Sequence, residues 1–593
     1  MLERTASVAI APTQALTGRR ILFAALCVAS LAAILWLAAS ALAGNGHPVL
    51  NAVLLVLFAV TLPWIVIGFW NSAIGFLLMR FARDSLRSVL PAARRIRGDE
   101  PVAASTAILF CIRNEPHARV TRNLLPMMEG LAASGHAARF HVYILSDRGE
   151  AAGDAERAHF AKLADAWKDR LAVTYRRRAA NTGFKAGNIA DFCARFGAAH
   201  DFALPLDADS FMTADAMLRI VRIMQASPEI GILQSLVVGM PSTSAFARLF
   251  QFGMRLSMRS FTLGSAWWQG DCGPYWGHNA IFRIAPFMAH CALPVLPARG
   301  LLGGYVLSHD QIEAVLMRRA GYEVRVLPEE DGSFEENPPT LIEFIRRDLR
   351  WCQGNMQYWH FLGLPGLRFI SRYQLAFALL MFLGSPAWMG LLATGTLAVA
   401  LSAQPAALVS PGPGLAVYLI VVLLWFAPKA ATLLDILTRR DARKSFGGTF
   451  RLLASFAAEG LFSVLLLPIM FFGHTLFLAR LLLGKTVGWG GQMRDDHAVP
   501  WSLAARHLWP QTLFGAVCIA ILAASHPPAI PYALFIAAGL VLAVPLAVLT
   551  ASPGIGRALA RLGIGRLPEE TQAPAALRAL GLPAFDILKR GRA

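Results

Sequence analysis

The sequence predicts a polytopic α-helical membrane protein with an α/β domain inserted between its membrane helices. Of its 593 residues, 56% are hydrophobic and only 16% are charged, which is far from the balance of a soluble protein. Several apolar runs reach the roughly 20 residues that a helix needs to cross a bilayer. Over residues 81–370 the apolar runs shorten, and strand-like stretches alternate with amphipathic helical ones. This alternation predicts a parallel α/β sheet.

The first two apolar runs, residues 21–43 and 50–79, predict a transmembrane hairpin over residues 21–80. A cleaved signal peptide has a shorter apolar core, and here a second apolar run follows almost at once. The hairpin places the tail of residues 1–20 and the α/β domain on the same side of the membrane. By the positive-inside rule that side is the cytosol, because arginines gather after the hairpin: Arg80, Arg83, Arg87, Arg94, Arg95 and Arg97.

Residues 371–449 predict a transmembrane pair, and residues 511–550 predict a second transmembrane hairpin. The tail of residues 551–593 is basic and prefers the cytosol. Parity then requires the apolar stretch 450–484 to cross the membrane an even number of times. We therefore expect residues 450–510 to form an interfacial or re-entrant segment with a following loop. A single crossing of 450–484 is the simpler alternative, and the number of crossings stays open.

The charge and cysteine patterns argue against two other classes of protein. A net charge of +18 could suggest nucleic-acid binding, but arginine and lysine gather where apolar runs end, as they do in membrane proteins. The seven cysteines are scattered and form no CxxC pair, so neither a disulfide framework nor a zinc site is indicated. We expect no nucleic acid among the partners.

Polar side chains directly follow three predicted strands, residues 106–111, 140–145 and 202–206. Because the carboxyl ends of parallel strands meet at one edge of a sheet, we expect these polar clusters to converge. The clusters are Arg113-Asn114-Glu115, Ser146-Asp147 and Asp207-Ala208-Asp209.

Asp207 and Asp209 bracket one small residue, so both carboxylates can approach one divalent cation. Mg²⁺ or Mn²⁺ takes few protein carboxylates and fills its other positions with water and phosphate oxygens, which suits a nucleotide diphosphate. Taken alone, the pair could equally be two solvated loop aspartates. Asp147 could hold a uracil edge or ribose hydroxyls, or it could cap a helix.

Three further stretches carry candidate chemistry. Lys185 lies between two glycines at the start of a predicted helix, where an ammonium group and backbone amides could meet a diphosphate, although the spacing is not that of a P-loop. Asp310 precedes another helix and is either a helix cap or the base for an acceptor hydroxyl. Arg347 and Arg350 could bind a diphosphate, and Trp351 offers a flat face to a sugar ring. Basic residues before a membrane entry are the plainer explanation of this last stretch.

In this order and between membrane spans, the motifs resemble those of the cellulose-synthase-like processive enzymes of glycosyltransferase family 2. Within that group the chain is most similar to the glucans biosynthesis glucosyltransferase H family. The strings that carry this similarity are FKAGNIADF, WGHNAIFR, GGYVLSHDQIEA and RRDLRWCQGNMQYW. The resemblance covers residues 101–360 strongly. It implies a GT-A, Rossmann-like glycosyltransferase domain on the cytosolic side of a bacterial inner membrane.

The resemblance implies an inverting hexosyltransferase that uses UDP-glucose and Mg²⁺, or Mn²⁺, to build the β-1,2-linked backbone of osmoregulated periplasmic glucans. It also implies export of the growing glucan chain across the inner-membrane lipid, and it suggests acyl carrier protein and periplasmic glucan-processing proteins as partners. A cellulose, chitin or hyaluronan synthase and a transporter that only binds a nucleotide stay open as alternatives. An intact Asp310 favours an enzyme, because binding alone needs no base.

Residue by residue, the resemblance implies that Asp147 contacts the uridine and that Asp207 and Asp209 hold the diphosphate and the metal. Asp310 would be the catalytic base. The other residues implied to bind the UDP-sugar are Arg113, Asn114, Glu115, Lys185, Arg347 and Arg350. Those implied to bind the acceptor are Trp351, Gly277, His278 and Asn279, although the last three could be a plain glycine turn before the strand 280–283.

Enteric family members have a long N-terminal cytosolic region, so a division-control role is not expected from the short tail here. Arg347 stands where many synthases have Gln, which adds charge beside the acceptor and the diphosphate. Related synthases close a gating loop over the nucleotide after an interfacial helix, and we expect Trp489, Gln492 and Arg494 to do so here, with an inert connector as the alternative.

Overall fold

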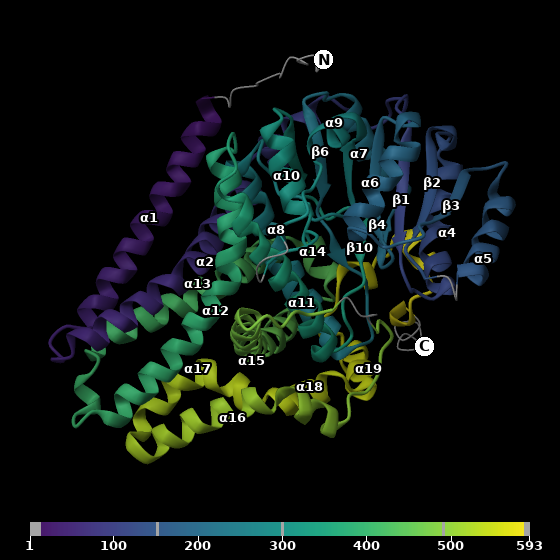
Figure 1. Cartoon of the computed structure of the whole chain (residues 1–593). Helices are drawn as coiled ribbons and strands as arrows, with labels where there is room; N and C mark the ends of the chain where they lie inside the picture. Colours follow the sequence, from purple (N-terminus) through teal and green to yellow (C-terminus); the bar gives the residue numbers. More distant parts are fainter. Residues whose placement is uncertain (1–13, 150–152, 298–301, 489–492, 586–593) are drawn as a thin grey trace.

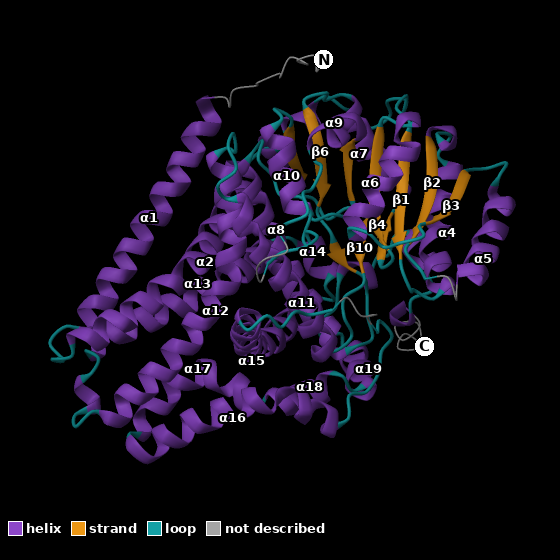
Figure 2. Cartoon of the chain, in the orientation of Figure 1, coloured by secondary structure: helices purple, strands orange, loops and turns teal. Residues whose placement is uncertain are grey.

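The computed structural model describes residues 14–149, 153–297, 302–488 and 493–585. An α/β domain lies beside a group of long helices that come from both the N-terminal and the C-terminal parts of the chain (Figure 1). The strands gather in the α/β domain alone (Figure 2). This arrangement confirms the predicted fold class, an α/β domain inserted in a polytopic helical protein.

The main sheet of the α/β domain has seven strands among the described residues. In spatial order they are β3 (Ala172–Arg177), β2 (Phe140–Ser146), β1 (Thr106–Ile112), β4 (Phe202–Asp207), β8 (Ala280–Arg283), β6 (Ile230–Ser235) and β9 (Glu323–Leu327). The first four are parallel, as predicted. The expectation of a wholly parallel sheet is wrong at β8, which is antiparallel to β4 and β6. The chain returns to the edge where β6 ended, since Ala280 pairs with Gln234, so β8 must run backwards.

Helices cover both faces of this sheet. One face packs against α4 (His117–Ala133), α5 (Gly153–Trp167) and α7 (Ala214–Gln225) in a single hydrophobic cluster. The other packs against α6 (Phe184–Phe196), α9 (Ile284–His290) and α10 (Asp310–Arg319). A small sheet of β5 (Ser210–Met212), β10 (Ser333–Glu335) and β7 (Val238–Gly239) lies next to the end of β4.

Six helices of the described chain are long and apolar enough to cross a membrane. They are α1 (Gln14–Leu42), α2 (Pro48–Phe81), α12 (Phe369–Leu401), α13 (Pro411–Leu437), α15 (Thr449–Leu482) and α16 (Trp501–Ser525). The helices α17 (Ile530–Val541) and α18 (Ala543–Thr550) pass the same test only as a pair, which is bent by 54°. The protein is therefore a multi-pass membrane protein.

Helix α8 (Ala245–Gln269) joins the α/β domain to the membrane helices by packing closely on α2. A side chain at Gly264 would meet the carbonyl oxygen of Asn71 at 1.8 Å, and one at Gly75 would meet that of Ser260 at 1.9 Å. Trp268 also donates from its indole nitrogen to Asn71 Oδ1 at 2.8 Å. The two glycines therefore let the backbones approach, and the domain is fixed to the bundle at this crossing.

Helix α15, predicted as an interfacial or re-entrant segment, is one continuous helix of 34 residues. In Figure 1 it is seen along its axis, whereas α1, α2, α12 and α13 lie across the view. It therefore crosses the direction that these four helices share. Its length and apolar character alone would also allow it to span a membrane.

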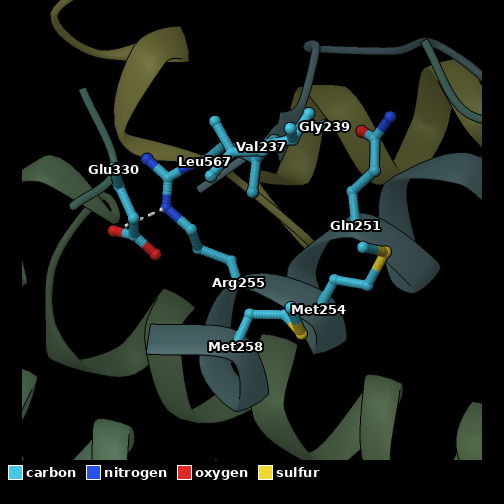
Figure 3. A pocket seen from close by; sticks show the side chains of 9 residues that line it. Val237, Gly239, Gln251, Met254, Arg255, Met258, Glu330 and Leu567 are labelled. Carbon is cyan, nitrogen blue, oxygen red and sulfur yellow. Dashed lines mark ion pairs between the residues drawn. The ribbon is translucent and has the colours of Figure 1, made fainter. Parts of the chain in front are cut away.

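The chain after α18 packs against the α/β domain. Gly556 in α19 (Pro553–Leu562) lies so close to α8 that a side chain there would meet Thr243 O at 2.0 Å. Arg255 of α8 forms ion pairs with Glu569 and with Glu330, the latter at 3.1 Å beside a small pocket that Leu567 also lines (Figure 3). The helix α20 (Ala575–Ala579) then joins the cluster around α4.

Candidate active site

The candidate site lies at the carboxyl edge of the main sheet, where β1, β2 and β4 end. Glu115, after β1, turns back on its own loop because its Oε2 accepts the backbone N–H groups of Arg113 at 2.6 Å and Asn114 at 3.1 Å. Arg148, after β2, donates to Glu115 O at 3.0 Å. The loops after β1 and β2 therefore meet at this edge.

Asp147 is held by Arg178, a residue that the sequence did not single out. The carboxylate accepts hydrogen bonds from Arg178 Nε at 2.7 Å and Nη2 at 2.8 Å, and both side chains are buried. The same guanidinium donates to the carbonyl oxygens of Thr182 at 2.9 Å and Phe184 at 3.0 Å. One arginine thus connects the end of β2 to the loop that begins α6.

Lys185 connects the first turn of α6 to the end of β4. Its ammonium group forms an ion pair with Asp207 and donates to Gly277 O at 2.7 Å. Burial opposes the charge on both groups, but their mutual attraction prevails, so the pKa of Lys185 is raised and the pKa of Asp207 falls to about 2. Both groups are therefore charged at neutral pH.

Asp209 forms an ion pair with Arg494, which approaches from the loop after α15. Burial opposes the charge of Arg494, but Asp209 and Glu115 raise its pKa above the usual value. Of the three residues predicted to form a gate, Arg494 thus reaches the aspartate turn. Trp489 and Gln492 lie outside the described residues.

The two residues after Arg494 are also held by the α/β domain. Asp495 forms an ion pair with Arg119 of α4, and Asp496 accepts a hydrogen bond from the hydroxyl of Thr243, just before α8. Residues 494–496 of this loop are therefore each attached to the α/β domain, two of them outside the aspartate turn.

Asp310 is the first residue of α10, and its Oδ1 accepts the backbone N–H of Gln311 at 3.0 Å. The hydroxyl of the buried Tyr358 interacts with Asp310; burial and this carboxylate raise its pKa well above the usual value, so it stays protonated. Beside it, His309 Nδ1 lies 2.8 Å from Glu313 Oε2. Burial opposes a charged His309, but Glu313 raises its pKa overall.

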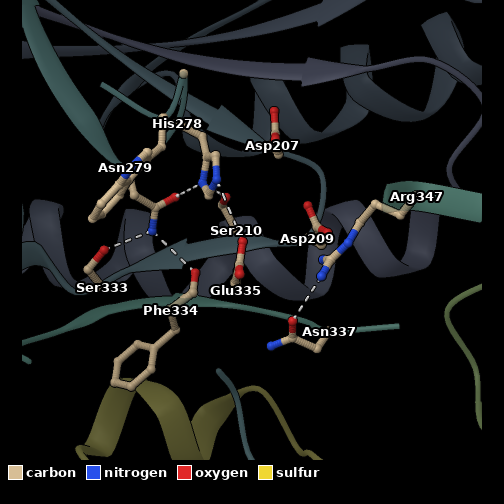
Figure 4. A network of polar contacts seen from close by, with 12 residues as sticks. Asp207, Asp209, Ser210, His278, Asn279, Ser333, Phe334, Glu335, Asn337 and Arg347 are labelled. Atoms are coloured by element: carbon tan, nitrogen blue, oxygen red, sulfur yellow. Dashed lines mark hydrogen bonds and ion pairs between the residues drawn. The ribbon is translucent and has the colours of Figure 1, made fainter. Parts of the chain in front are cut away.

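The turn 277–279 lies next to Asp310, since a side chain at Gly277 would meet Asp310 Cβ at 3.3 Å. Gly277 and Asn279 have φ of 77° and 48°, so the turn needs left-handed backbone. The amide of Asn279 is buried and donates to Ser333 Oγ at 2.9 Å and Phe334 O at 3.2 Å (Figure 4). The structure therefore gives Asn279 a framework role in the turn, and its contact with an acceptor stays a prediction.

Helix α11 (Leu341–Met356) brings Arg347, Arg350 and Trp351 to the site. The guanidinium of Arg347 lies 4.7 Å from the centre of the Trp351 ring and donates to Asn337 Oδ1 at 3.4 Å. Trp351 remains 47% exposed. Arg350 lines a pocket together with Phe184, Leu307, Gln353, Val487 and Gly488. The pocket places Arg350 beside the start of α6.

The residues of the aspartate turn fit a divalent cation. Asp207 and Asp209 each attract a protein cation, Lys185 and Arg494. Across the described ranges, no group of three or more His, Cys, Asp or Glu side chains is arranged to hold a metal. Two carboxylates from one turn suit an ion that takes its other ligands from water and substrate phosphate.

Sequence reasoning missed Arg178, Tyr358 and Glu335 as members of the site. Arg178 could have been found, because it directly follows β3 and so lies at the same carboxyl edge as the other clusters. Tyr358 and Glu335 follow no strand of the main sheet, and only the tertiary structure brings them there.

A model of the family described as glycosyl transferase family group 2 matches residues 204–433. The chain is 35% identical over 585 residues to glucans biosynthesis glucosyltransferase H of Ralstonia nicotianae, covering 95% of this chain and 66% of the relative. It is 35% identical to the same-named protein of Pseudomonas aeruginosa over 543 residues, covering 89% and 62%. The chain thus spans less than two thirds of these two relatives.

A third relative of the same name, from Xylella fastidiosa, is 34% identical over 551 residues, and the match covers 90% of this chain and 86% of the relative. A solved mannosyltransferase of Pyrobaculum calidifontis, in complex with GDP-mannose and Mn²⁺, aligns with a TM-score of 0.38 and 17% identity, over 61% of this chain and 96% of that one. Because this identity extends over 86% of the Xylella relative, the chain belongs to the glucans biosynthesis glucosyltransferase H family.

Proposed function

We propose that this protein is an inverting, processive glucosyltransferase that builds a β-1,2-linked glucan from UDP-glucose with Mg²⁺. One observation supports this above the others. Three separate segments bring a carboxylate pair, a further carboxylate and an arginine–tryptophan pair to one edge of the sheet. Binding of a nucleotide alone would not require Asp310 beside the turn that also contacts Lys185.

In the proposed reaction Asp310 accepts the proton of an acceptor hydroxyl, whose oxygen forms a bond to C1 of the donor glucose. The bond between C1 and the diphosphate breaks, and UDP leaves. A divalent cation at Asp207 and Asp209 would neutralise the diphosphate. Lys185 and Arg350 would stabilise the charge that develops on the leaving group, and the protonated Tyr358 would orient Asp310.

The resemblance also supports finer proposals. The donor site would face the cytosol of a bacterial cell, and the glucan would leave through the inner membrane. Acyl carrier protein and periplasmic glucan-processing proteins would act as partners. Asp147 would contact the uridine, His278 and Trp351 the acceptor, and Arg494 the diphosphate once the loop closes.

The full chain, purified in detergent and supplied with radiolabelled UDP-glucose and Mg²⁺, tests the proposal. We expect a polymer that a β-1,2-specific glucanase degrades. Asp310→Asn should lower the rate of transfer by roughly a hundred- to ten-thousandfold while UDP still binds. No polymer from the wild type, or equal polymer from Asp310→Asn, would refute the assignment. A product that resists the glucanase would instead indicate another family 2 synthase.

A further inference from the structure

Glu335 is a carboxylate of the site to which neither the sequence motifs nor the reaction above gives a role. It is the last residue of β10, which pairs with β5, and its partner in the register is Ser210. Ser210 directly follows Asp209. The small sheet therefore places Glu335 beside the aspartate turn, as Figure 4 shows.

Glu335 makes few hydrogen bonds and ion pairs for a carboxylate beside the aspartate turn. Its side chain is 20% exposed, and the ion pair found for it within the described chain is with His278 Nε2, at 3.6 Å. The next residue, Glu336, forms ion pairs with both Arg119 and Arg122. Glu336 is thus engaged in holding α4, whereas Glu335 keeps oxygen atoms available for a ligand.

The charges around Glu335 indicate what kind of ligand it would accept. Burial, Asp209 and Asp207 raise its pKa, and His278 and Arg347 oppose them. Glu335 itself would repel a phosphate, and the proposed reaction holds the diphosphate elsewhere, through a cation at Asp207 and Asp209 and the nearby Lys185 and Arg494. A neutral hydroxyl donor meets no such repulsion, and a carboxylate accepts hydrogen bonds from hydroxyls well.

Arg347 supplies a second, independent indication of a ligand. Its Nε is buried and has no hydrogen-bond partner in the described chain, although the guanidinium stacks on Trp351. Burial lowers the pKa of Arg347, and the charge of Glu335 opposes this effect. Glu335 thus lies beside the aspartate turn, and Arg347 lies against the exposed ring of Trp351.

We propose that Glu335 is a sugar-binding residue of the transfer site, whose carboxylate accepts hydrogen bonds from hydroxyl groups of a hexose held between the aspartate turn and Trp351. This inference rests on the proposed function. The hexose is either the glucose of the donor or the terminal glucose of the acceptor. His278 lies 3.6 Å from the carboxylate, and the charge of Arg347 favours its ionised form.

The test uses the full chain in detergent and compares the wild type, Glu335→Gln and a matched control, Glu229→Gln. The carboxylate of Glu229 lies away from the site and forms an ion pair with Arg95 at 2.5 Å. Calorimetric titration with UDP and with UDP-glucose, both with Mg²⁺, separates the nucleotide from the sugar. Steady-state kinetics then give KM for UDP-glucose and for a β-1,2-gluco-oligosaccharide acceptor.

We expect Glu335→Gln to bind UDP like the wild type and to lose roughly ten- to a hundredfold in kcat/KM. Weaker UDP-glucose binding would assign the contact to the donor, and a raised acceptor KM alone would assign it to the acceptor. Glu335→Asp should recover part of the loss. Unchanged kinetics, or equal loss of UDP binding, would overturn the inference. Absence of transfer in the wild type would instead refute the proposed function.

Discussion

Arg178 contacts two segments at once, so the planar shape of its guanidinium matters as much as its charge. Its Nε and Nη2 donate to Asp147, and its Nη1 and Nη2 donate to the backbone carbonyl oxygens of Thr182 and Phe184, ahead of Lys185. A lysine could satisfy the charge of Asp147 but not the carbonyl groups of the loop. The position of Asp147, the proposed uridine contact, therefore depends on Arg178.

Arg178→Lys should weaken binding of UDP by roughly tenfold or more, because it leaves buried acceptors without partners. Titration calorimetry with Mg²⁺ measures this. Arg195→Lys is the matched control, since Arg195 pairs with Asp191 in the last turn of α6 and its side chain is largely exposed. Equal UDP affinity for the two variants would show that Arg178 does not organise the site.

The pair between Arg494 and Asp209 competes with any cation that binds the aspartate turn. Arg494→Met removes this competitor and should increase the affinity for Mn²⁺ in the absence of nucleotide by roughly tenfold, which corresponds to about 1.4 kcal/mol. Electron paramagnetic resonance of free Mn²⁺ measures the change, with the exposed Arg506→Met as control. An unchanged affinity would mean that the loop does not hold Asp209 in solution.

At the scale of elements, α8 is held from both sides. On the membrane side it packs on α2 through glycines, and on the other side Arg248 and Arg255 bind Glu570 and Glu569 of the C-terminal segment. Thr243, one of the anchors of the loop after α15, immediately precedes α8. The C-terminal segment thus stabilises α8, the helix that begins just after Thr243.

Glu570→Gln should destabilise the α/β domain, because it leaves the guanidinium of Arg248 buried without a countercharge. Both side chains are 1% exposed, and breaking a buried pair in this way typically costs about 3–5 kcal/mol. A lower midpoint of thermal unfolding in detergent would show it. Glu129→Gln, an exposed position on α4, should leave the midpoint unchanged. Identical transitions for the two variants would contradict the assigned role of the pair.

The elements that could be predicted from the sequence are those with a local signal. The strands β1, β2 and β4 each combine an apolar run with a polar end, and the Lys185 and Trp351 segments carry recognisable strings. The reversed strand β8, the partner strand of Glu335 and the docking of the C-terminal segment depend on contacts between distant parts of the chain. Charge counting indicates where the tail of residues 551–593 would lie, but not that its glutamates enter ion pairs with α8.

At the scale of the whole molecule, the connections between membrane helices indicate the two sides of the bilayer. The backbone N–H of Ser410, before α13, donates to Ala41 O at 2.7 Å. The side-chain amide of Asn45, after α1, donates to Leu408 O at 3.0 Å. In Figure 1 the connections α1–α2, α12–α13 and α16–α17 lie at the same end of the molecule, away from the sheet. This end would face the periplasm.

If α15 lies along the membrane surface, both of its ends face the cytosol, whereas a span would separate them. We predict that Thr449→Cys and Lys485→Cys, both exposed positions, react with an impermeant maleimide only after the inner membrane is opened. His47→Cys and Gln404→Cys are the periplasmic references and should react in intact spheroplasts. The native cysteines are buried or half-buried, so background labelling should be low. Labelling of one α15 end alone in spheroplasts would make α15 a span and would refute its placement along the membrane surface.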